Sequence, residues 1–274
     1  MLPWQKSYEG IGGMADNGQQ VALITGGTSG IGLAVAETLA GRGCKVFIGS
    51  RTPEAVEETV GKLRSNGYEA DGAAADVRRP EDVARLVGAA VERYGHIDVL
   101  VNNAGRSGGG VTADIADELW YDVIDTNLNS VFLMTREALR SGRLLERGRG
   151  RIINIASTGG KQGVVLGAPY SASKHGVIGF TKALGLELAK TGVTVNAVCP
   201  GYVETPMAQR VRQGYAAHFD TTEEEILERF QAKIPLGRYS TPEEVAALVE
   251  YLVSDAAAPV TAQAINVCGG LGNY

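Results

Sequence analysis

The sequence lacks the features that would place the protein in a membrane, in an oxidising compartment or on nucleic acid. It contains no run of about 18 apolar residues, so no segment is expected to span a membrane. Residues 1–20 lack the continuous apolar centre of a signal peptide, which predicts a cytoplasmic protein. The three cysteines, Cys44, Cys199 and Cys268, are far apart, which fits buried free thiols in a reducing compartment. The net charge of -5 disfavours nonspecific binding to nucleic acid.

Histidine is also scarce. His96, His175 and His218 are scattered along the chain and form no metal-ligand spacing, so no metal centre is expected. Residues 1–20 show no periodicity and are expected to form a flexible leader, in which Met14 is an alternative start to Met1. No linker or internal repeat divides the remainder, which predicts one domain from residue 21 to residue 274.

From residue 21 onward, short apolar runs alternate with amphipathic stretches. Strands are expected at 21–24, 45–50, 68–77, 97–101, 151–156, 193–198 and 264–267. Helices between them include a long region at 114–145 and another at 168–190. This alternation predicts an α/β fold of Rossmann type, a doubly wound seven-stranded parallel sheet with ligands at the carboxyl ends of its strands.

Three local signals refine this fold. Thr52 can cap a helix whose first residue is Pro53, and Thr241-Pro-Glu-Glu244 forms a capping box that opens the last long helix. A polar segment with scattered aromatics, about 205–231, interrupts the alternation of strands and helices. We expect this segment to form a helical lid over a pocket.

A glycine-rich turn follows the first strand. Gly26, Gly30 and Gly32 are spaced for a tight turn, a close approach of the backbone to a pyrophosphate, and the packing of a helix against a strand. The helix that begins near Ser29 would direct its free amide groups at that phosphate. The alternative is an ordinary turn with flexible glycines.

A tyrosine and a lysine one helical turn apart suggest proton chemistry. Tyr170 and Lys174 project from the same face of a helix, and a cation beside a phenol favours the phenolate, so Tyr170 is a candidate general acid. Ser157, at the carboxyl end of the fifth strand, can hold a substrate carbonyl oxygen. Asn127 could anchor a water that relays protons to Lys174. Taken alone, such a Tyr-Lys pair is also typical of exposed residues that have no catalytic function.

Together these motifs resemble the short-chain dehydrogenase/reductase family, from Val21 to the end of the sequence. The resemblance implies that Ser157 and Tyr170 bind a carbonyl, that Lys174 holds the nicotinamide ribose and that Asn127 holds the relay water. It implies cofactor contacts from Gly26, Thr28, Ser29, Gly30, Ile31, Gly32, Asp76, Val77, Asn103, Gly105, Tyr170, Lys174, Pro200, Gly201, Val203 and Thr205. We therefore expect an active enzyme.

The residue after the second strand indicates which cofactor is used. A protein of this kind that binds NAD needs an acidic residue there, whereas this chain has Ser50-Arg51. Arg51 can pair with a 2′-phosphate and stack on the adenine, which predicts NADPH and a preference for reduction. The alternative is that Arg51 is merely solvated.

Several longer stretches resemble one branch of the family, the ketoreductases of aromatic (type II) polyketide synthesis. They include Asn102 to Gly110, Ile155 to Gly163 and Asn266 to Tyr274. The resemblance implies reduction of one ketone, at C9, of a poly-β-ketone tethered through phosphopantetheine to an acyl carrier protein. It also implies a homotetramer.

Further residues fit this reading. Arg51, Arg78 and Arg106 each follow a strand end and are expected to form a basic rim that docks the carrier protein. The substrate wall is expected to comprise Ser107, Gly108, Gly109, Thr158, Gln162, Val164, Met207, Tyr215 and Phe219. The alternative to the rim is that Arg78 and Arg106 are merely solvated. The alternative to the wall is that Met207 and Phe219 pack in the core of the lid. Ser107 stands where a member of the branch has proline, which leaves the chain position and the stereochemistry of the alcohol open.

Other functions remain alternatives at this point. A fatty-acid 3-oxoacyl-carrier-protein reductase or a secondary-alcohol dehydrogenase would use the same mechanism on other ketones. A sensor that binds NADP without catalysis would keep the fold, although the intact residues Asn127, Ser157, Tyr170 and Lys174 argue against it.

Overall fold

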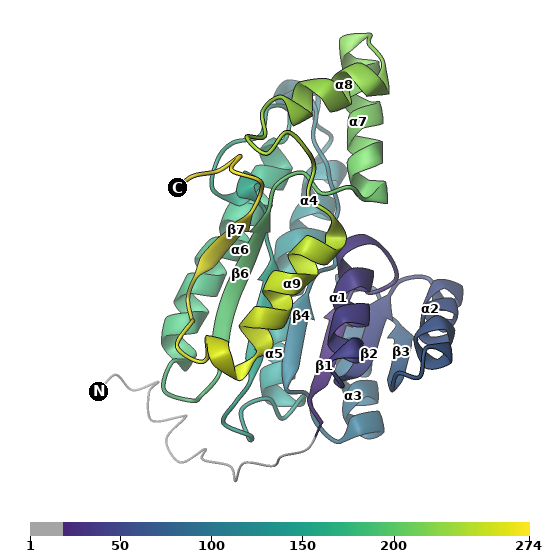
Figure 1. Ribbon diagram of the computed structural model, residues 1–274, viewed down its shortest axis with the longest axis vertical. Helices are drawn as coiled ribbons and strands as arrows, with labels where there is room; N and C mark the ends of the chain where they lie inside the picture. The colour runs from purple at the N-terminus through teal and green to yellow at the C-terminus, as the bar shows by residue number, and fades with distance from the viewer. Residues whose placement is uncertain (1–18) are drawn as a thin grey trace.

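The computed structural model describes residues 19–274 of the chain (Figure 1). The predicted flexible leader and the choice between Met1 and Met14 therefore lie outside the described residues, except for positions 19 and 20. Within residues 19–274, no helix is both long enough and apolar enough to cross a bilayer.

Seven parallel strands form the centre of the structure, in the order β3-β2-β1-β4-β5-β6-β7. The strands are β1 (Val21–Thr25), β2 (Lys45–Ser50), β3 (Ala70–Ala74), β4 (Val99–Asn102), β5 (Arg151–Ile155), β6 (Thr194–Pro200) and β7 (Ala264–Val267). The strand order reverses direction on the two sides of β1, which is the doubly wound arrangement. The predicted fold class is confirmed.

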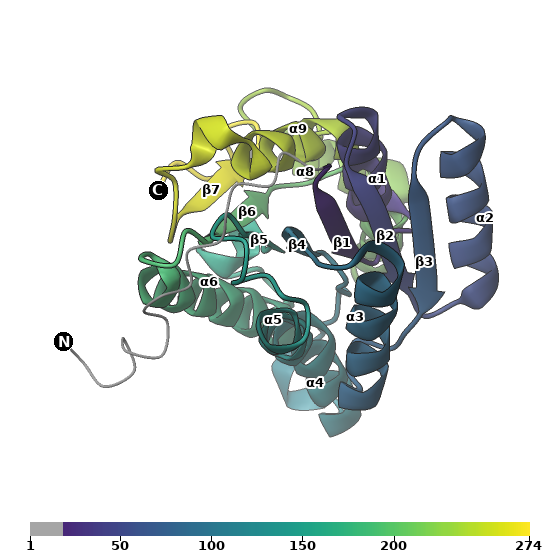
Figure 2. The same cartoon turned by 90° about the horizontal axis from the view of Figure 1, so that it is seen from below.

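Helices cover both faces of the sheet (Figure 2). One layer contains α1 (Gly30–Gly41), α2 (Pro53–Ser65) and α9 (Pro242–Val253), and the other contains α3 (Pro80–Tyr94), α4 (Asp117–Ile124), α5 (Ser130–Arg140) and α6 (Ala168–Leu188). Successive strand residues point to opposite faces, so Ile24 packs in the core with α1 and α9 whereas Leu23 packs in the core with α3 and α5. Both faces of the strands are thus buried, as their apolar runs predict.

Two of the expected helices differ in detail from the structure. The predicted helix at 114–145 is divided into α4 and α5 by a π-helical turn, Asp125–Asn129, which buries Asn127 completely. The predicted capping box at Thr241 and Glu244 is confirmed. Thr52 does occupy the N-cap position of α2, but its side chain makes no capping hydrogen bond, so the predicted cap is wrong in that respect.

The segment expected to be a lid contains two helices, α7 (Pro206–Phe219) and α8 (Glu223–Gln231), beyond the carboxyl ends of the strands (Figure 1). Their small core includes Tyr202, stacked 4.8 Å from Phe230 and 5.2 Å from Tyr239 between ring centroids. The buried guanidinium of Arg212 donates two hydrogen bonds of 2.9 Å to Glu204. These contacts fasten α7 to the loop after β6, while closure over a pocket stays a prediction.

A buried carboxylate joins β1 to β4 at the opposite, amino end of the sheet. Asp98 is 1% exposed, and its Oδ2 accepts a 2.8 Å hydrogen bond from the Val21 backbone N–H. The same oxygen lies 3.0 Å from His96 Nε2. The other carboxylate oxygen, Oδ1, lies 2.7 Å from Arg147 Nε.

We expect Asp98→Ala to lower the free energy of unfolding by about 3 kcal/mol, because it leaves a buried amide and a half-buried guanidinium without their acceptor. Urea denaturation followed by circular dichroism measures the change. Asp255→Ala is the matched control, since the Asp255 side chain is 85% exposed and that variant should unfold like the parent. Equal unfolding midpoints for both variants would contradict this role of Asp98.

Candidate active site

The predicted site residues lie where the parallel strands end. Gly26 follows β1, Arg51 follows β2, and Asp76 lies two residues after β3. Asn103 follows β4, and Ser157 lies two residues after β5. Because carboxyl ends of parallel strands meet at one edge of a sheet, residues distant in sequence are brought to that edge.

The glycine turn is built by backbone conformations that other residues rarely adopt. Gly26 has φ 66° and Gly30 has φ 53°. A Cβ on Gly32 would collide with the Gly26 carbonyl oxygen and with Asn103 Nδ2, so only glycine lets α1 begin this close to the turn. Asn103 Nδ2 donates to the carbonyl oxygens of Thr25, at 2.9 Å, and Gly26, at 3.1 Å. The structure thus uses the Asn103 side chain to hold the turn itself.

The turn fits a pyrophosphate. Ser29 is the N-cap of α1, but its side chain makes no capping hydrogen bond and the first turn contains no acidic residue. The amide groups at this end are therefore suited to an anion. A Cβ on Gly30 would lie 3.3 Å from Thr205 Cγ2, so a side chain there would narrow the space between the start of α1 and the start of α7.

The residues expected around the adenosine end lie beside this turn. Thr28 Oγ1 donates a 3.1 Å hydrogen bond to Ser50 Oγ, and the next residue, Arg51, is exposed. Asp76 accepts hydrogen bonds from the Arg78 guanidinium, which holds the pKa of the Asp76 carboxyl below its usual value. Arg51 and Thr28 are thus placed to meet a charged group at the end of β2.

Lys174 lies inside the protein, one turn along α6 from Tyr170. Its side chain is buried, and Nζ donates a 2.8 Å hydrogen bond to the Ile155 carbonyl oxygen at the end of β5. Nζ lies 5.9 Å from the centroid of the Tyr170 ring. Burial lowers the pKa of Lys174 to about 8. The alternative that Tyr170 and Lys174 are merely exposed surface residues is therefore excluded.

The Tyr170 phenol behaves differently from the sequence-based expectation. Burial raises the pKa of Tyr170, and the hydrogen bond with Ser157 lowers it by less. Desolvation therefore dominates the pKa of Tyr170, and stabilisation of the phenolate by the Lys174 cation stays a prediction. A protonated phenol is the form that a proton donor needs.

Asn127 joins three parts of the site. Its Oδ1 accepts a 2.8 Å hydrogen bond from the Arg106 N–H, and its Nδ2 donates to the Arg106 carbonyl oxygen at 3.0 Å and to Ser173 Oγ at 3.1 Å. The π-helical turn thereby fixes the loop after β4 against α6, close to Lys174. Water relay by Asn127 stays a prediction.

Two glycines that the sequence analysis did not assign to the site lie against the candidate catalytic residues. A Cβ on Gly159 would lie 3.2 Å from Tyr170 Cε1 and 3.3 Å from Ser157 Oγ. A Cβ on Gly160 would lie 2.6 Å from the Lys174 carbonyl oxygen. The Gly-Gly pair that begins two residues after Ser157 was the available signal, since two small residues there let the loop lie against α6.

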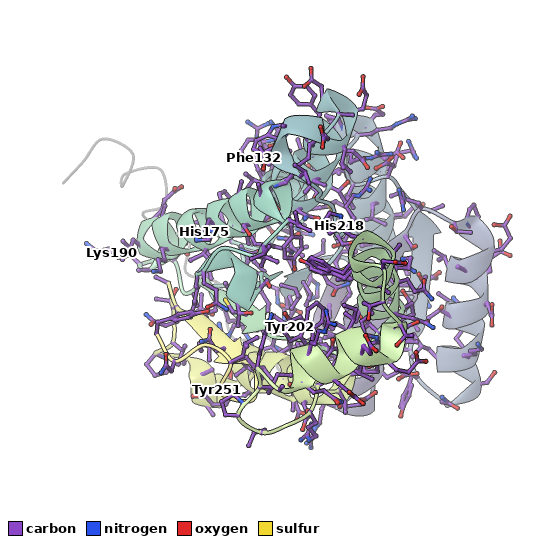
Figure 3. The ribbon with its side chains drawn as sticks, turned by 90° about the horizontal axis from the view of Figure 1, so that it is seen from above. Phe132, His175, Lys190, Tyr202, His218 and Tyr251 are labelled. Atoms are coloured by element: carbon purple, nitrogen blue, oxygen red, sulfur yellow. The ribbon has the colours of Figure 1, made fainter. Side chains whose placement is uncertain are left out.

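The expected substrate wall is brought together only in part. The loop with Gly108 and Gly109 is tied to the loop before α6, because Gly110 N–H donates a 2.8 Å hydrogen bond to the Leu166 carbonyl oxygen. Tyr215, on α7, donates a 2.5 Å hydrogen bond to the Val165 carbonyl oxygen. Phe219 is 49% exposed, and its ring lies edge-on to that of His218, which is labelled in Figure 3.

The remaining wall residues differ in exposure. Thr158 is 5% exposed, Met207 is half-buried, and Gln162 and Val164 are exposed. Ser107 is half-buried, and its carbonyl oxygen accepts a 3.0 Å hydrogen bond from Arg106 Nε.

The three arginines expected to form a basic rim do not present three free charges. Arg78 and Arg106 both form ion pairs with Asp122 on α4, and Arg78 also pairs with Asp76 at 2.5 Å. The shared carboxylate confirms that these two arginines lie together, but it neutralises part of their charge. The rim is therefore less basic than the count of arginines predicts.

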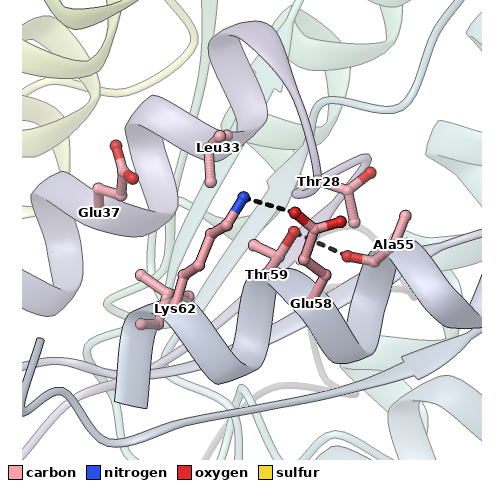
Figure 4. Close-up of a pocket in the computed structure, with 8 residues that line it drawn as sticks. Thr28, Leu33, Glu37, Ala55, Glu58, Thr59 and Lys62 are labelled. Atoms are coloured by element: carbon pink, nitrogen blue, oxygen red, sulfur yellow. Dashed lines mark hydrogen bonds and ion pairs between the residues drawn. The ribbon is translucent and has the colours of Figure 1, made fainter. Parts of the chain in front are cut away.

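One cavity extends from the glycine turn between two helices. This cavity of about 110 Å³ between α1 and α2 is lined mostly by side chains of those helices (Figure 4). Of the predicted site residues it includes only Thr28, and the Lys62–Glu58 ion pair of 2.6 Å, with both partners on α2, is part of its lining. Residues 19–274 hold no group of three or more His, Cys, Asp or Glu side chains placed to ligate a metal.

A parallel sheet with a glycine turn and, at one edge, a half-buried tyrosine one helical turn from a buried lysine defines an oxidoreductase of the short-chain type. The chain belongs to the short-chain dehydrogenase/reductase family. Residues 20–216 match the model of this family, which is described as short chain dehydrogenase. The predicted family and enzyme class are thus confirmed.

Several similar proteins are named as parts of polyketide synthases. A Streptomyces virginiae protein named as a ketoacyl reductase of the monensin polyketide synthase is 71% identical, covering 95% of this chain and 100% of its own. A Streptomyces violaceoruber protein named as a ketoacyl reductase of the granaticin polyketide synthase is 65% identical, covering 93% of each chain. A crystal structure of an actinorhodin polyketide ketoreductase variant with NADPH is 60% identical, with TM-score 0.92, covering 95% of this chain and 100% of that one. The NADPH in that structure agrees with the predicted cofactor.

We expect Lys174→Met to raise the free energy of unfolding by about 2 kcal/mol at pH 7, because it removes the desolvation cost of a buried cation. The pKa of Lys174 is lowered from 10.5 in the unfolded chain to about 8 in the folded protein. Between these pH values the folded parent has lost the proton that the unfolded chain still holds, so the stability of the parent rises with pH. Urea unfolding at pH 7 and pH 10 should show the advantage of the variant shrink. Lys190→Met, at the exposed end of α6, is the control. A destabilised Lys174→Met at pH 7 would refute this prediction.

Proposed function

We propose that the protein is an NADPH-dependent ketoreductase of aromatic polyketide biosynthesis. It reduces one ketone, at C9, of a poly-β-ketone bound to an acyl carrier protein. The observation that carries this proposal is the half-buried Tyr170 phenol, which shares the surroundings of Gly159 with the Ser157 hydroxyl and lies one helical turn from the buried Lys174 amine. The names of the relatives at 71% and 65% identity support the pathway.

The residues of the site suit ketone reduction. NADPH, when bound, supplies a hydride to the ketone carbon. Tyr170 donates a proton to the ketone oxygen, and its raised pKa keeps the phenol protonated at neutral pH. The Ser157 hydroxyl donates a hydrogen bond to the same oxygen, since Ser157 Oγ already accepts one of 3.0 Å from the Gly159 N–H. The Lys174 cation lies near enough to stabilise the phenolate that this donation leaves.

The predicted cofactor residues fit NADPH. The turn of Gly26, Thr28, Ser29, Gly30, Ile31 and Gly32 would hold the pyrophosphate, with the amide groups of α1 directed at it. Arg51 would pair with the 2′-phosphate, and Asp76 and Val77 would flank the adenine. Asn103 and Gly105, together with Pro200, Gly201, Val203 and Thr205, would border the nicotinamide half.

We expect Arg51→Asp to weaken NADPH binding by at least about tenfold and NADH binding by less, because a carboxylate repels the 2′-phosphate. Fluorescence titration with each nucleotide gives the two dissociation constants. Arg140→Asp, an exposed arginine on α5, should change neither. Unchanged NADPH affinity in Arg51→Asp would remove the basis for this cofactor assignment.

We expect rapid NADPH oxidation with a bulky bicyclic ketone such as trans-1-decalone, and a fall in kcat of about 10³-fold in Tyr170→Phe. The loss should come without a matching loss of NADPH affinity, because the ring of the variant fills the same space. Absorbance at 340 nm follows the oxidation. A short acetoacetyl thioester is the comparison substrate.

Other results would select other functions. Turnover of the short thioester alone would indicate a fatty-acid 3-oxoacyl-carrier-protein reductase, and turnover of simple free ketones would indicate a secondary-alcohol dehydrogenase. Tight NADPH binding without turnover of any ketone would indicate a sensor.

The proposal includes docking of the carrier protein beside Arg51, Arg78 and Arg106, and a homotetramer. Arg51 is exposed, and the ion pairs of Arg78 and Arg106 with Asp122 place the other two guanidinium groups side by side. An acidic carrier protein would compete with Asp122 for these donors. Three large hydrophobic side chains, Trp120 and Tyr121 on α4 and Phe132 on α5, are exposed and would suit contact with a second copy.

We expect Arg106→Ala to lower kcat/KM about tenfold for a carrier-bound ketone and to leave kcat/KM for trans-1-decalone unchanged, because only the former needs the docking contact. Steady-state kinetics with both substrates measures the two values. Arg140→Ala should affect neither. An equal loss for both substrates would assign Arg106 to the substrate loop instead of the docking surface.

A further inference from the structure

A lysine in the loop after the catalytic serine reaches across to the last strand. Lys161 follows the short 3-10 turn Thr158–Gly160, four residues after Ser157. Its Nζ donates hydrogen bonds of 2.7 Å to the Ala264 carbonyl oxygen and of 2.7 Å to Asn266 Oδ1, both on β7. The Lys161 side chain thereby connects the catalytic loop to a strand more than a hundred residues away, since the separation from Ala264 is 103 positions.

The residues after β7 turn back onto the same loop. Gly269 has φ 59° and Gly270 has φ 88°, which lets the chain reverse beside β7 (Figure 1). Asn266 Nδ2 donates a 2.9 Å hydrogen bond to the Gly272 carbonyl oxygen. The Tyr274 hydroxyl donates to the Thr158 carbonyl oxygen at 3.4 Å, and its ring centroid lies 5.7 Å from Lys161 Nζ.

The contacts of this tail therefore form a closed chain of interactions with the catalytic loop. Lys161 holds Asn266, Asn266 holds the tail through Gly272, and Tyr274 at the end of the tail contacts Thr158. Thr158 adjoins Ser157 in sequence, and Thr158 O also accepts hydrogen bonds from the Lys161 N–H at 3.0 Å and the Gln162 N–H at 3.1 Å. A displacement of this loop would move the Ser157 hydroxyl and the expected substrate residues together.

We infer that Lys161 is a positioning residue, which with Asn266 and the tail 271–274 holds the catalytic loop 157–162 in the geometry that accepts the ketone oxygen. The inference rests on the proposed function for its kinetic consequence. Its structural part, the bracing of the loop, does not depend on any ligand. The hydrogen bonds given for the Lys161 side chain go to Ala264 and Asn266 on β7, so it acts through the loop that carries Ser157.

The test compares Lys161→Met with Lys161→Arg and with the control Lys190→Met. Methionine keeps the apolar stem but loses the donors, whereas arginine keeps donors that can reach β7. Lys190 lies at the far end of α6 and points away from the molecule (Figure 3). A chain that ends at residue 270 removes the tail contacts and keeps Lys161.

Hydrogen exchange in the protein without ligands is the first readout. The backbone amides of Gly160, Lys161 and Gln162 all donate hydrogen bonds within the loop. We expect their exchange to speed up about tenfold in Lys161→Met and in the shortened chain, and to stay unchanged in Lys190→Met. Unchanged exchange in Lys161→Met would overturn the inference.

Kinetics supply the second readout. We expect kcat/KM for trans-1-decalone to fall about tenfold in Lys161→Met, with NADPH affinity within about twofold of the parent and partial recovery in Lys161→Arg, because a small misplacement of the loop affects the ketone first. When Lys161→Met is combined with the shortened chain, the loss of kcat/KM should be little larger than for either single change, since both changes remove parts of the same set of contacts. Additive losses, or a loss of NADPH affinity as large as the loss of kcat/KM, would overturn the inference.

The two proposals fail separately. If the parent reduces no ketone while exchange responds as expected, the proposed function fails and the brace stands. If the parent reduces the ketone while exchange in Lys161→Met is unchanged, the brace fails and the function stands.

Discussion

The structure depends on an amine that is buried beside a phenol at the carboxyl edge of the sheet. Lys174 loses most of its contact with water, and in return Nζ keeps a 2.8 Å hydrogen bond to the Ile155 carbonyl oxygen. This arrangement costs stability, because burial disfavours the charged amine and lowers its pKa to about 8. A cost of this kind is typical of functional sites, where groups are held in environments that suit a reaction more than they suit folding.

The rest of the fold keeps that amine and the neighbouring phenol in place. Beneath the site, the side chains of adjacent strands form a buried polar ladder, in which Asn102 Nδ2 donates to Asn154 Oδ1 at 2.9 Å and Asn154 Nδ2 donates to Thr181 Oγ1 at 2.9 Å on α6. The ladder joins β4 and β5 to the helix that carries Tyr170 and Lys174. Asn127 adds a second tie between the loop after β4 and the same helix. Preorganisation of the catalytic groups thus comes from side chains that do not themselves touch a substrate.

Much of this could be predicted from the sequence, because the pattern of apolar runs determines which residues end a parallel strand. The strand ends then place Gly26, Arg51, Asn103 and Ser157 at one edge without any knowledge of their contacts. The spacing of Tyr170 and Lys174 likewise predicts that they share a helix face.

Other properties depend on partners that are distant in sequence. No local pattern indicates that Asp122 pairs with both Arg78 and Arg106, so the basic rim was overestimated. The direction of the Tyr170 pKa could not be predicted either, because it depends on how far the surrounding loops exclude water. The contact of Tyr274 with Thr158 joins residues 116 positions apart and follows no local periodicity.

The measurement that tests the central claim most directly is the pH dependence of kcat/KM for ketone reduction at saturating NADPH. If Tyr170 donates the proton and the Lys174 cation supports that donation, kcat/KM should be constant at neutral pH and should fall as the pH rises past about 8, where the amine loses its proton. A value that rises from pH 7 to pH 10 would contradict the account, because it would mean that the site works with a neutral amine and an ionised phenol.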